Sequence, residues 1–249
     1  MKIAVCIRRV PDTTAKITIA GGGTAIDPAG VKFVINPYDE FAVEAAIALK
    51  EAAGAGETVT IALGDDSVQE TIRTTLAMGI DRAVHLQGTG SADGLATARV
   101  LADHLRGGGY DLILFGKLAV DDYGQQVGPM VAELLELPCA TAITALEVAD
   151  GSATVEREIE GGTEVATCPL PAVLTCDKGL NTPRLPGLKG IMAAKKKPLE
   201  VVPVEAAAGQ ATIVSLALPP ERPAGRIVGE GAAAVPALIE ALTSEAKVL

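Results

Sequence analysis

The chain has 249 residues, of which 49% are hydrophobic and 21% are charged, a balance typical of a folded globular protein. Its 31 acidic and 21 basic side chains give a formal net charge of −10. Such a surplus of negative charge repels phosphate backbones and anionic membranes, so we expect no nucleic-acid partner and no direct membrane insertion. The length suits one large domain with an extension, or two small domains.

Cysteine and histidine usage argues against several kinds of catalytic or metal site. The four cysteines form no C-x-x-C pair and are widely spaced, at Cys6, Cys139, Cys168 and Cys176. With only His85 and His104 available, a His-rich metal site is excluded and a Ser/His/Asp triad has little to draw on. We interpret both histidines as structural and expect no bound metal.

Localisation signals are not visible in the sequence. The chain enters a strand-like run at once, without a basic region followed by an apolar stretch, and no apolar run reaches transmembrane length. We therefore expect a soluble protein, cytoplasmic in a bacterium, or in the mitochondrial matrix if the source is eukaryotic.

The first half alternates short apolar runs with stretches of helical period. Strands are predicted at Lys2–Ile7, Thr58–Leu63, Ala83–Gln87 and Asp111–Phe115. Helices are predicted at Asp39–Lys50, Ser67–Met78, Ala92–Arg106 and Gln125–Leu135. This alternation predicts an α/β fold, a Rossmann-like parallel sheet with helices on both faces.

The pattern changes after Pro138. Two turn signals, "ADG" and "EGG", lie between β-rich runs and predict an added antiparallel meander. Val202–Arg226 is predicted to be extended, and "VPALIEALTSEA" to form a final short helix. We therefore divide the chain into a core with its meander (1–183), an intervening segment (184–201) and an extended C-terminal arm (202–249), which either wraps a partner or is flexible.

Two stretches carry features of a phosphate site. In "INPYDEFAVEAA", Asn36 and Pro37 form a turn, and Tyr38 or Asp39 is predicted to be the N-cap of the following helix. "FGKLAVDDYGQQVGPMVAELL" places a glycine and a polar loop between a strand and a helix, which favours an anion at the helix start. This second stretch matches neither Walker A nor G-x-G-x-x-G, so generic nucleotide motifs do not support it. Taken alone, the first stretch is better explained by ordinary helix capping.

The strand exits share one edge of the predicted sheet. Cys6, Asn36, Leu63 and Gly116 are therefore expected to line one crevice, a position that favours a nucleotide over a catalytic constellation. Ser67 is available as a helix cap, and "GGG" at 21–23 is interpreted as a hairpin turn. The paired acids Asp121 and Asp122 suit a cap or a solvated loop better than a magnesium site.

Several motifs in order resemble the β subunit of electron transfer flavoprotein along essentially the whole chain. They are "NPYDEFAVEAA", "QETIRTTLAMGIDRA", "GKLAVDDYGQQVG", "EREIEGGTE", "LPAVLT", "LNTPRLPGLKGIMAAKKKP" and "PPERPAG". The resemblance implies a heterodimer with an α subunit that holds most of the FAD, and a structural AMP in the β subunit. It further implies electron transfer from acyl-CoA and related dehydrogenases, commonly to a membrane quinone oxidoreductase and hence in fatty acid oxidation, without a catalytic acid, base or nucleophile in this chain.

The resemblance also carries site residues over. The implied AMP contacts are Cys6, Asn36, Pro37, Tyr38, Asp39, Leu63, Gly116, Lys117, Leu118, Ala119, Val120, Asp121, Asp122, Tyr123, Gly124, Gln125, Gln126 and Val127. The implied partner-docking residues are Pro186, Gly187, Leu188, Ile191, Met192 and Glu158. Residues 184–201 then correspond to a partner-recognition loop with Leu188 as its anchor in a dehydrogenase pocket, Glu158 faces the mobile flavin domain, and the arm wraps the α subunit.

Two departures keep alternatives open. "VPDT" at 10–13 lacks the tyrosine found near the flavin in mitochondrial-type members, and "QVGP" at 126–129 is similar to electron-bifurcating relatives, in which a second FAD replaces AMP and NADH is oxidised. The acidic stretch lacks the "DGDTAQ" run of that group, which favours AMP. A stand-alone ATP- or AMP-binding module is the third hypothesis, and the proline-rich arm argues against it.

Overall fold

The computed structural model describes residues 1–88, 93–205, 209–221 and 224–249, which form two compact units, Met1–Ser215 and Leu216–Leu249. The two units are described separately below. The predicted helix start at Ala92 and parts of the predicted extended stretch, 206–208 and 222–223, lie outside the described residues.

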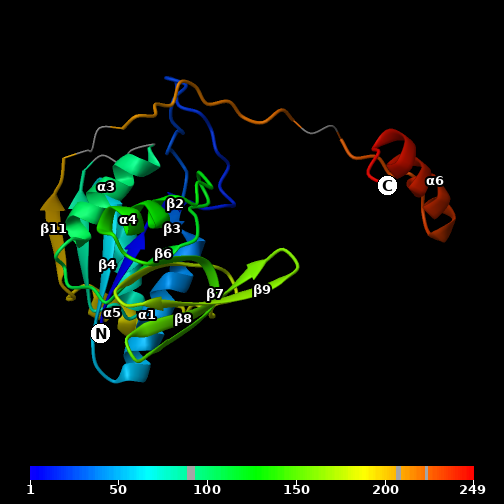
Figure 1. Cartoon of the computed structure of the whole chain (residues 1–249). Coiled ribbons are helices and arrows are strands. Elements are labelled where there is room, and N and C mark those ends of the chain that lie inside the picture. The colour runs from blue at the N-terminus through cyan, green and yellow to red at the C-terminus, as the bar shows by residue number, and fades with distance from the viewer. Residues whose placement is uncertain (89–92, 206–208, 222–223) are drawn as a thin grey trace. The chain divides into compact units, whose positions relative to one another are not determined.

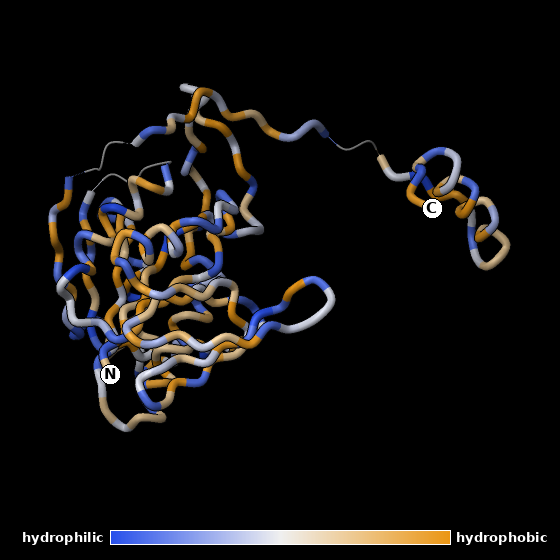
Figure 2. Tube along the Cα trace, in the orientation of Figure 1, coloured by the Kyte–Doolittle hydropathy of each residue, from blue (hydrophilic) through white to orange (hydrophobic). Residues whose placement is uncertain are grey.

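A nine-stranded sheet forms the centre of the first unit within the described residues, in the order β11-β5-β4-β1-β6-β10-β7-β8-β9 (Figure 1). Its parallel strands are β1 (Lys2–Ile7), β4 (Glu57–Gly64), β5 (Arg82–Gln87), β6 (Leu112–Gly116), β7 (Cys139–Ala149), β10 (Ala172–Cys176) and β11 (Leu199–Pro203). The four predicted strands are confirmed, with bounds shifted by one residue or less. Figure 2 shows apolar segments concentrated within this body.

Helices cover both faces of the sheet, as predicted. They are α1 (Pro37–Ala53), α2 (Val68–Met78), α3 (Gly94–Leu105) and α4 (Val127–Leu135). Along β1, Ile3 and Val5 pack in the core cluster with α1 and α2, whereas Ala4 and Cys6 pack in the second cluster with α3 and α4. Because successive side chains of a strand point to opposite faces, one continuous apolar strand supplies both cores.

The antiparallel part lies at one end of the sheet. β7 pairs with β8 (Ser152–Ile159), and β8 pairs with β9 (Gly162–Pro169), through the two predicted turns. The stretch predicted as a meander is only partly antiparallel, because its last run, β10, returns between β6 and β7 and is parallel to both. The β8–β9 hairpin projects from the body of the first unit (Figure 1).

Four short elements were not predicted. β2 (Arg9–Pro11) and β3 (Phe33–Ile35) form a separate two-stranded antiparallel sheet. The intervening segment contains a helix, α5 (Leu188–Ala194), where we expected an open loop. β11 pairs with β5 and forms one edge of the parallel sheet. The predicted boundary between the intervening segment and the arm, at residue 202, therefore falls inside this strand. The triglycine turn is confirmed by an antiparallel bridge between Ile19 and Ile26.

The second unit contains the predicted C-terminal helix in three consecutive pieces: a 3₁₀ turn η1 (Ala232–Ala234), α6 (Val235–Glu240) and a π turn η2 (Ala241–Glu245). Arg226 forms an ion pair with Glu245 within this unit (Nη2 to Oε2, 2.6 Å). Val235, Leu238 and Ile239 share one helical face and are exposed. Among the described helices, none is long and apolar enough to cross a membrane.

Candidate functional site

The site lies where the order of strands in the sheet reverses direction. The chain runs from β1 to β4 and β5 on one side and then returns to β6 on the other side of β1. A cavity of about 250 Å³ opens at the carboxyl ends of β1 and β6. Ligands in open α/β sheets bind at such a switch point, so the fold itself marks this cavity as the candidate binding site.

The floor of the cavity is a buried carboxylate that joins three segments. Asp39, at the start of α1, accepts hydrogen bonds from the backbone N–H of Arg8 (2.7 Å), the backbone N–H of Gly116 (3.0 Å) and the Asn36 side chain (2.9 Å). Burial raises the pKa of Asp39 from its ordinary value of 3.8 to about 7, although these three donors act in the opposite direction. The carboxylate thereby holds the β1 and β6 exits together.

Asn36 supports the same floor from the other side. Its side-chain amide donates to the carbonyl of Leu118 (2.7 Å) and accepts from the N–H of Val120 (3.1 Å). The N-cap of α1 is Asn36, and Pro37 follows in the first turn, so the predicted N-cap at Tyr38 or Asp39 was wrong. Proline fits the first turn because an N–H at that position would have no intrahelical acceptor.

The wall of the cavity is the loop that follows β6, and its charged groups are paired. Arg8 contacts both Asp121 (Nη2 to Oδ2, 2.8 Å) and Asp122 (Nη1 to Oδ2, 2.5 Å). Burial raises the pKa of Asp121, the Arg8 guanidinium lowers it, and the neighbouring Asp122 carboxylate raises it. The loop is thus tied to the end of β1 across the mouth of the cavity.

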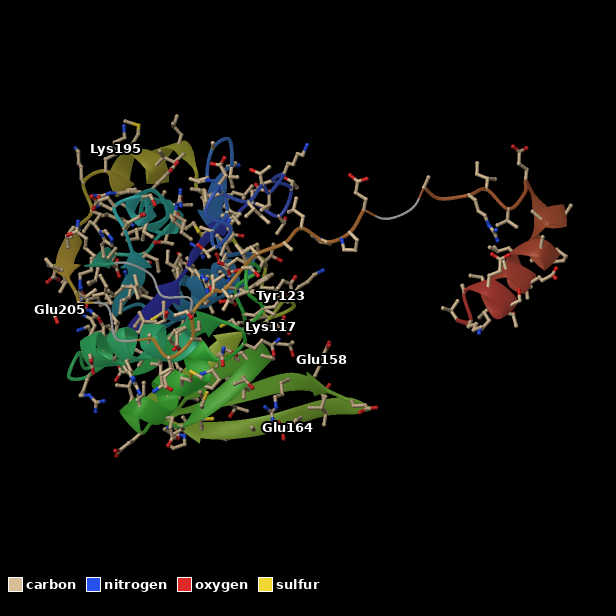
Figure 3. All side chains as sticks on the ribbon, turned by 90° about the horizontal axis from the view of Figure 1, so that it is seen from above. Lys117, Tyr123, Glu158, Glu164, Lys195 and Glu205 are labelled. Atoms are coloured by element: carbon tan, nitrogen blue, oxygen red, sulfur yellow. The ribbon has the colours of Figure 1, made fainter. Side chains whose placement is uncertain are left out.

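Lys117, which lines the cavity, is paired with a carboxylate. Its Nζ lies 2.7 Å from Oδ2 of Asp177 and 5.1 Å from the centroid of the Tyr38 ring. Lys117 and Tyr123, both labelled in Figure 3, belong to the loop between β6 and α4. Tyr123 and Gln125 have positive φ values of 55° and 54°, a conformation that costs non-glycine residues free energy and is typical of binding loops.

The far end of the cavity is the start of α4. Gln126 is the N-cap, and within the described residues its side chain makes no capping hydrogen bond. Val127 and Gly128, which line the cavity, therefore present first-turn N–H groups and the positive end of the helix dipole to it. Backbone donors of this kind suit a phosphate oxygen without a formal cation.

Replacing Gly128 with alanine is expected to weaken nucleotide binding. A Cβ there would lie 2.6 Å from Cγ2 of buried Thr175, so α4 must move away from β10, at a cost of about 1–3 kcal/mol. The control is Gly162→Ala on β9, a glycine outside the cavity lining whose Cβ would meet no atom within 4 Å. Nucleotide released from the denatured, purified variants measures both; equal retention in the two would contradict this account.

The structure brings most of the expected nucleotide contacts together. The cavity-lining members of the expected set are Cys6, Asp39, Leu63, Gly116, Lys117, Leu118, Ala119, Asp122, Gly124, Gln125, Gln126 and Val127. The expected residues outside the lining are Asn36, Pro37, Tyr38, Val120, Asp121 and Tyr123. Asn36 was expected to line the crevice, but it braces the loop from beneath because its amide is consumed by backbone partners.

Further lining residues were missed by the sequence interpretation, namely Ile7, Arg8, Gly94, Thr97, Leu101, Phe115 and Gly128. Arg8 directly follows β1 and Phe115 is the penultimate residue of β6, the two strands that flank the switch point, so their positions in the sequence could have indicated them. Gly94, Thr97 and Leu101 come from α3, which reaches the cavity only through its packing beside α4, and no local motif marks them.

Cys6 is the cysteine that lines the cavity. Burial, with the nearby Asp39 carboxylate, raises the pKa of the Cys6 thiol, so it remains protonated and unreactive. Among the described residues no three metal-ligating side chains gather. Buried His85 contacts the carbonyl of Gly64 through Nε2 (2.9 Å), in agreement with the structural role that we expected.

The expected docking residues lie apart from the cavity. Leu188 is 75% exposed at the start of α5, Met192 and Ile191 are also exposed, and Pro186 and Gly187 precede the helix. Glu158 lies on β8 opposite Thr163 of β9. In Figure 3, Lys195 at the end of α5 and Glu158 lie at opposite ends of the first unit.

Comparison with known proteins gives a consistent result. Residues 24–207 match the electron transfer flavoprotein domain. The chain is similar to "Electron transfer flavoprotein subunit beta" of Syntrophomonas wolfei (46% identity, covering 90% of this chain and 88% of the relative) and of Bacillus subtilis (40%, covering all of both chains). It is 39% identical to the mouse protein of that name, over 90% of this chain and 91% of the relative.

Proposed function

The chain belongs to the electron transfer flavoprotein family, in which its relatives are β subunits, and from this premise we propose that it binds a structural AMP and docks electron-donating dehydrogenases. The observation that carries the proposal is the cavity at the switch point, closed by the loop after β6 and by the start of α4. In this proposal the chain is a carrier subunit, and the reacting flavin is held mainly by the α subunit.

The cavity fits a mononucleotide. Leu63, Leu101, Phe115 and Val127 provide apolar walls for a base, and the first turn of α4 provides N–H donors for one phosphate. Its volume of about 250 Å³ is just below the usual range for small-molecule sites, roughly 300–1,000 Å³, and suits AMP better than a dinucleotide. The paired carboxylates Asp121 and Asp122 add negative charge at the mouth, which disfavours a second phosphate.

Counting nucleotides in the heterodimer tests this assignment. We expect coexpression with the α subunit to give one FAD and one AMP per heterodimer after denaturation. Two FAD and no AMP would overturn it in favour of the bifurcating type, which the "QVGP" sequence at 126–129 supports. A well-folded isolated chain that binds ATP would instead support a stand-alone module.

An α subunit is the partner proposed for the second unit. Val235, Leu238 and Ile239 form an exposed apolar face on α6, and Ile213 and Val214 are exposed on the preceding stretch. Apolar side chains grouped on one helical face are typical of a surface that is covered by another chain.

Docking of acyl-CoA and related dehydrogenases is proposed for α5 and its flanks, with Leu188 as the anchor. An exposed large apolar side chain with exposed apolar neighbours, Ile191 and Met192, is suited to filling a pocket on a partner. Glu158 is proposed to contact the mobile flavin domain, and a quinone oxidoreductase to accept the electrons. We propose a cytoplasmic location in a bacterium, or the mitochondrial matrix in a eukaryote.

A further inference from the structure

The docking helix α5 and the neighbouring helix α2 cap one another. Arg73 of α2 donates from Nη1 to the carbonyls of Ala194 (2.7 Å) and Lys197 (3.0 Å), at the end of α5. In return, Lys197 donates from Nζ to the carbonyls of Leu76 (2.8 Å) and Ile80 (2.5 Å), at the end of α2. Each cation therefore satisfies C-terminal carbonyls of the other segment, where a positive charge also complements the helix dipole.

The two helices also approach closely through a glycine. A Cβ on Gly190 would lie 2.2 Å from the carbonyl oxygen of Ala77, so only glycine allows α5 to lie this near to the last turn of α2. Ala194, one turn further on, is 3% exposed. The side of α5 that carries Gly190 and Ala194 is thus fixed against α2.

A third contact holds the segment before α5. Arg184 donates to Glu44 from its backbone N–H (3.0 Å) and from Nε (2.8 Å), and to Glu51 from Nη1 (2.8 Å). Both glutamates belong to α1, and their carboxylates raise the pKa of Arg184. The docking segment is therefore fastened at both ends, to α1 before the helix and to α2 after it.

The three consecutive lysines consequently differ in role. Lys195 and Lys196 are exposed, whereas Lys197 is half-buried and burial lowers the pKa of its ammonium group. Leu188 thus combines an exposed side chain with a braced backbone. An anchor that is already ordered avoids the entropy cost of ordering on binding, about 0.5–1.5 kcal/mol for each immobilised side chain.

We propose that Lys197 and Arg73 are positioning residues for dehydrogenase docking, which hold α5 so that Leu188 is presented in its binding orientation. This proposal rests on the docking function proposed above. The residues act through the helix and do not themselves contact the partner.

The test compares Lys197→Met with Lys196→Met in the purified heterodimer, because the two variants remove the same charge one residue apart. A purified acyl-CoA dehydrogenase that reduces the wild-type heterodimer serves as the electron donor. For Lys197→Met we expect the KM for the heterodimer to rise by about threefold to tenfold with kcat unchanged, and amide exchange within 188–194 to accelerate. Lys197→Arg, which restores a donor, should recover both readouts.

Salt separates positioning from simple charge attraction. Any rise in KM caused by Lys196→Met should disappear at high ionic strength, because exposed charges are screened, and exchange within α5 should stay unchanged. The effect of Lys197→Met should persist in high salt. A Lys197→Met effect that vanishes with salt, without faster exchange, would overturn the proposal.

Gly190→Ala provides a second variant that leaves the Lys197 cap of α2 in place, in case Lys197→Met fails to fold. It should displace α5 from Ala77 and raise KM without lowering kcat. If Leu188→Ala raises KM but neither Lys197→Met nor Gly190→Ala does so, the positioning role is wrong while the docking function stands. If Leu188→Ala leaves KM unchanged, the docking function itself is wrong, and faster exchange in Lys197→Met would then support the brace alone.

Discussion

Replacing Asp39 with alanine is expected to lower the free energy of unfolding by about 3 kcal/mol or more and to cause loss of the nucleotide proposed for the cavity. The substitution removes the acceptor of three N–H groups, on Arg8, Asn36 and Gly116. Asp39 itself is only 5% exposed, so water cannot replace the carboxylate easily, and each buried donor left without a partner costs about 1–3 kcal/mol. Chemical denaturation and nucleotide counting measure the two effects.

The penalty should depend on pH in a defined direction. The pKa of Asp39 is raised to about 7 in the folded protein, above the value in the unfolded chain. Between about pH 4 and pH 7 the folded state therefore holds a proton that the unfolded state lacks, and the contribution of Asp39 to stability falls as pH rises through this window. The difference between wild type and Asp39→Ala should thus be larger at pH 5 than at pH 8.

Asp103→Ala is the control for this experiment, because Asp103 is an exposed residue on α3. It should leave both stability and nucleotide content unchanged, within about 0.5 kcal/mol. The two free energies of unfolding to compare are those of wild type and Asp39→Ala. If their difference is the same at pH 5 and pH 8, the Asp39 carboxyl keeps one protonation state across this range, which contradicts the prediction.

Leu188→Ala is expected to raise the KM of an acyl-CoA dehydrogenase for the heterodimer by about 30-fold, corresponding to the roughly 2 kcal/mol of a hot-spot residue. Since Leu188 is 75% exposed and packs on no core, its removal should leave folding and flavin content intact. Steady-state reduction of the heterodimer measures the KM, and flavin absorbance measures the content.

Val165→Ala is the matched control for this docking prediction. Val165 is an apolar residue of β9 with 64% exposure, on the hairpin at the other end of the first unit from α5. The dehydrogenase KM should stay at the wild-type value in this variant. Similar losses from the two substitutions would mean that the effect comes from apolar surface in general.

The sequence predicts the parallel part of the sheet well. Its buried strands are short continuous apolar runs, whereas apolar residues recur with helical period in the stretches between them, so the two kinds of element are easily told apart. β1 matches its expected bounds, and α2 begins one residue from its expected start. The crevice also follows from the sequence, since the exits of parallel strands must share an edge. Cys6, Leu63 and Gly116 meet there as expected.

The missed features depend on contacts between distant parts of the chain. Pro186, Gly187 and Gly190 are typical of a loop, yet α5 forms because Arg73 and Gly190 fit it against α2. Asn36 similarly has the residue type of a cavity ligand, but its amide is taken by backbone groups more than 80 positions away. Tertiary packing thus determines both that α5 forms and where the Asn36 side chain lies, and no local sequence pattern predicts that packing.

The docking helix and the β8–β9 hairpin lie at opposite ends of the first unit, as Lys195 and Glu158 show in Figure 3. Molecules bound at the two ends therefore do not compete for one surface, and saturating one end should leave the dissociation constant at the other unchanged. Under the docking proposed for α5, a heterodimer would therefore exchange one dehydrogenase for another without releasing a molecule bound at the β8–β9 hairpin.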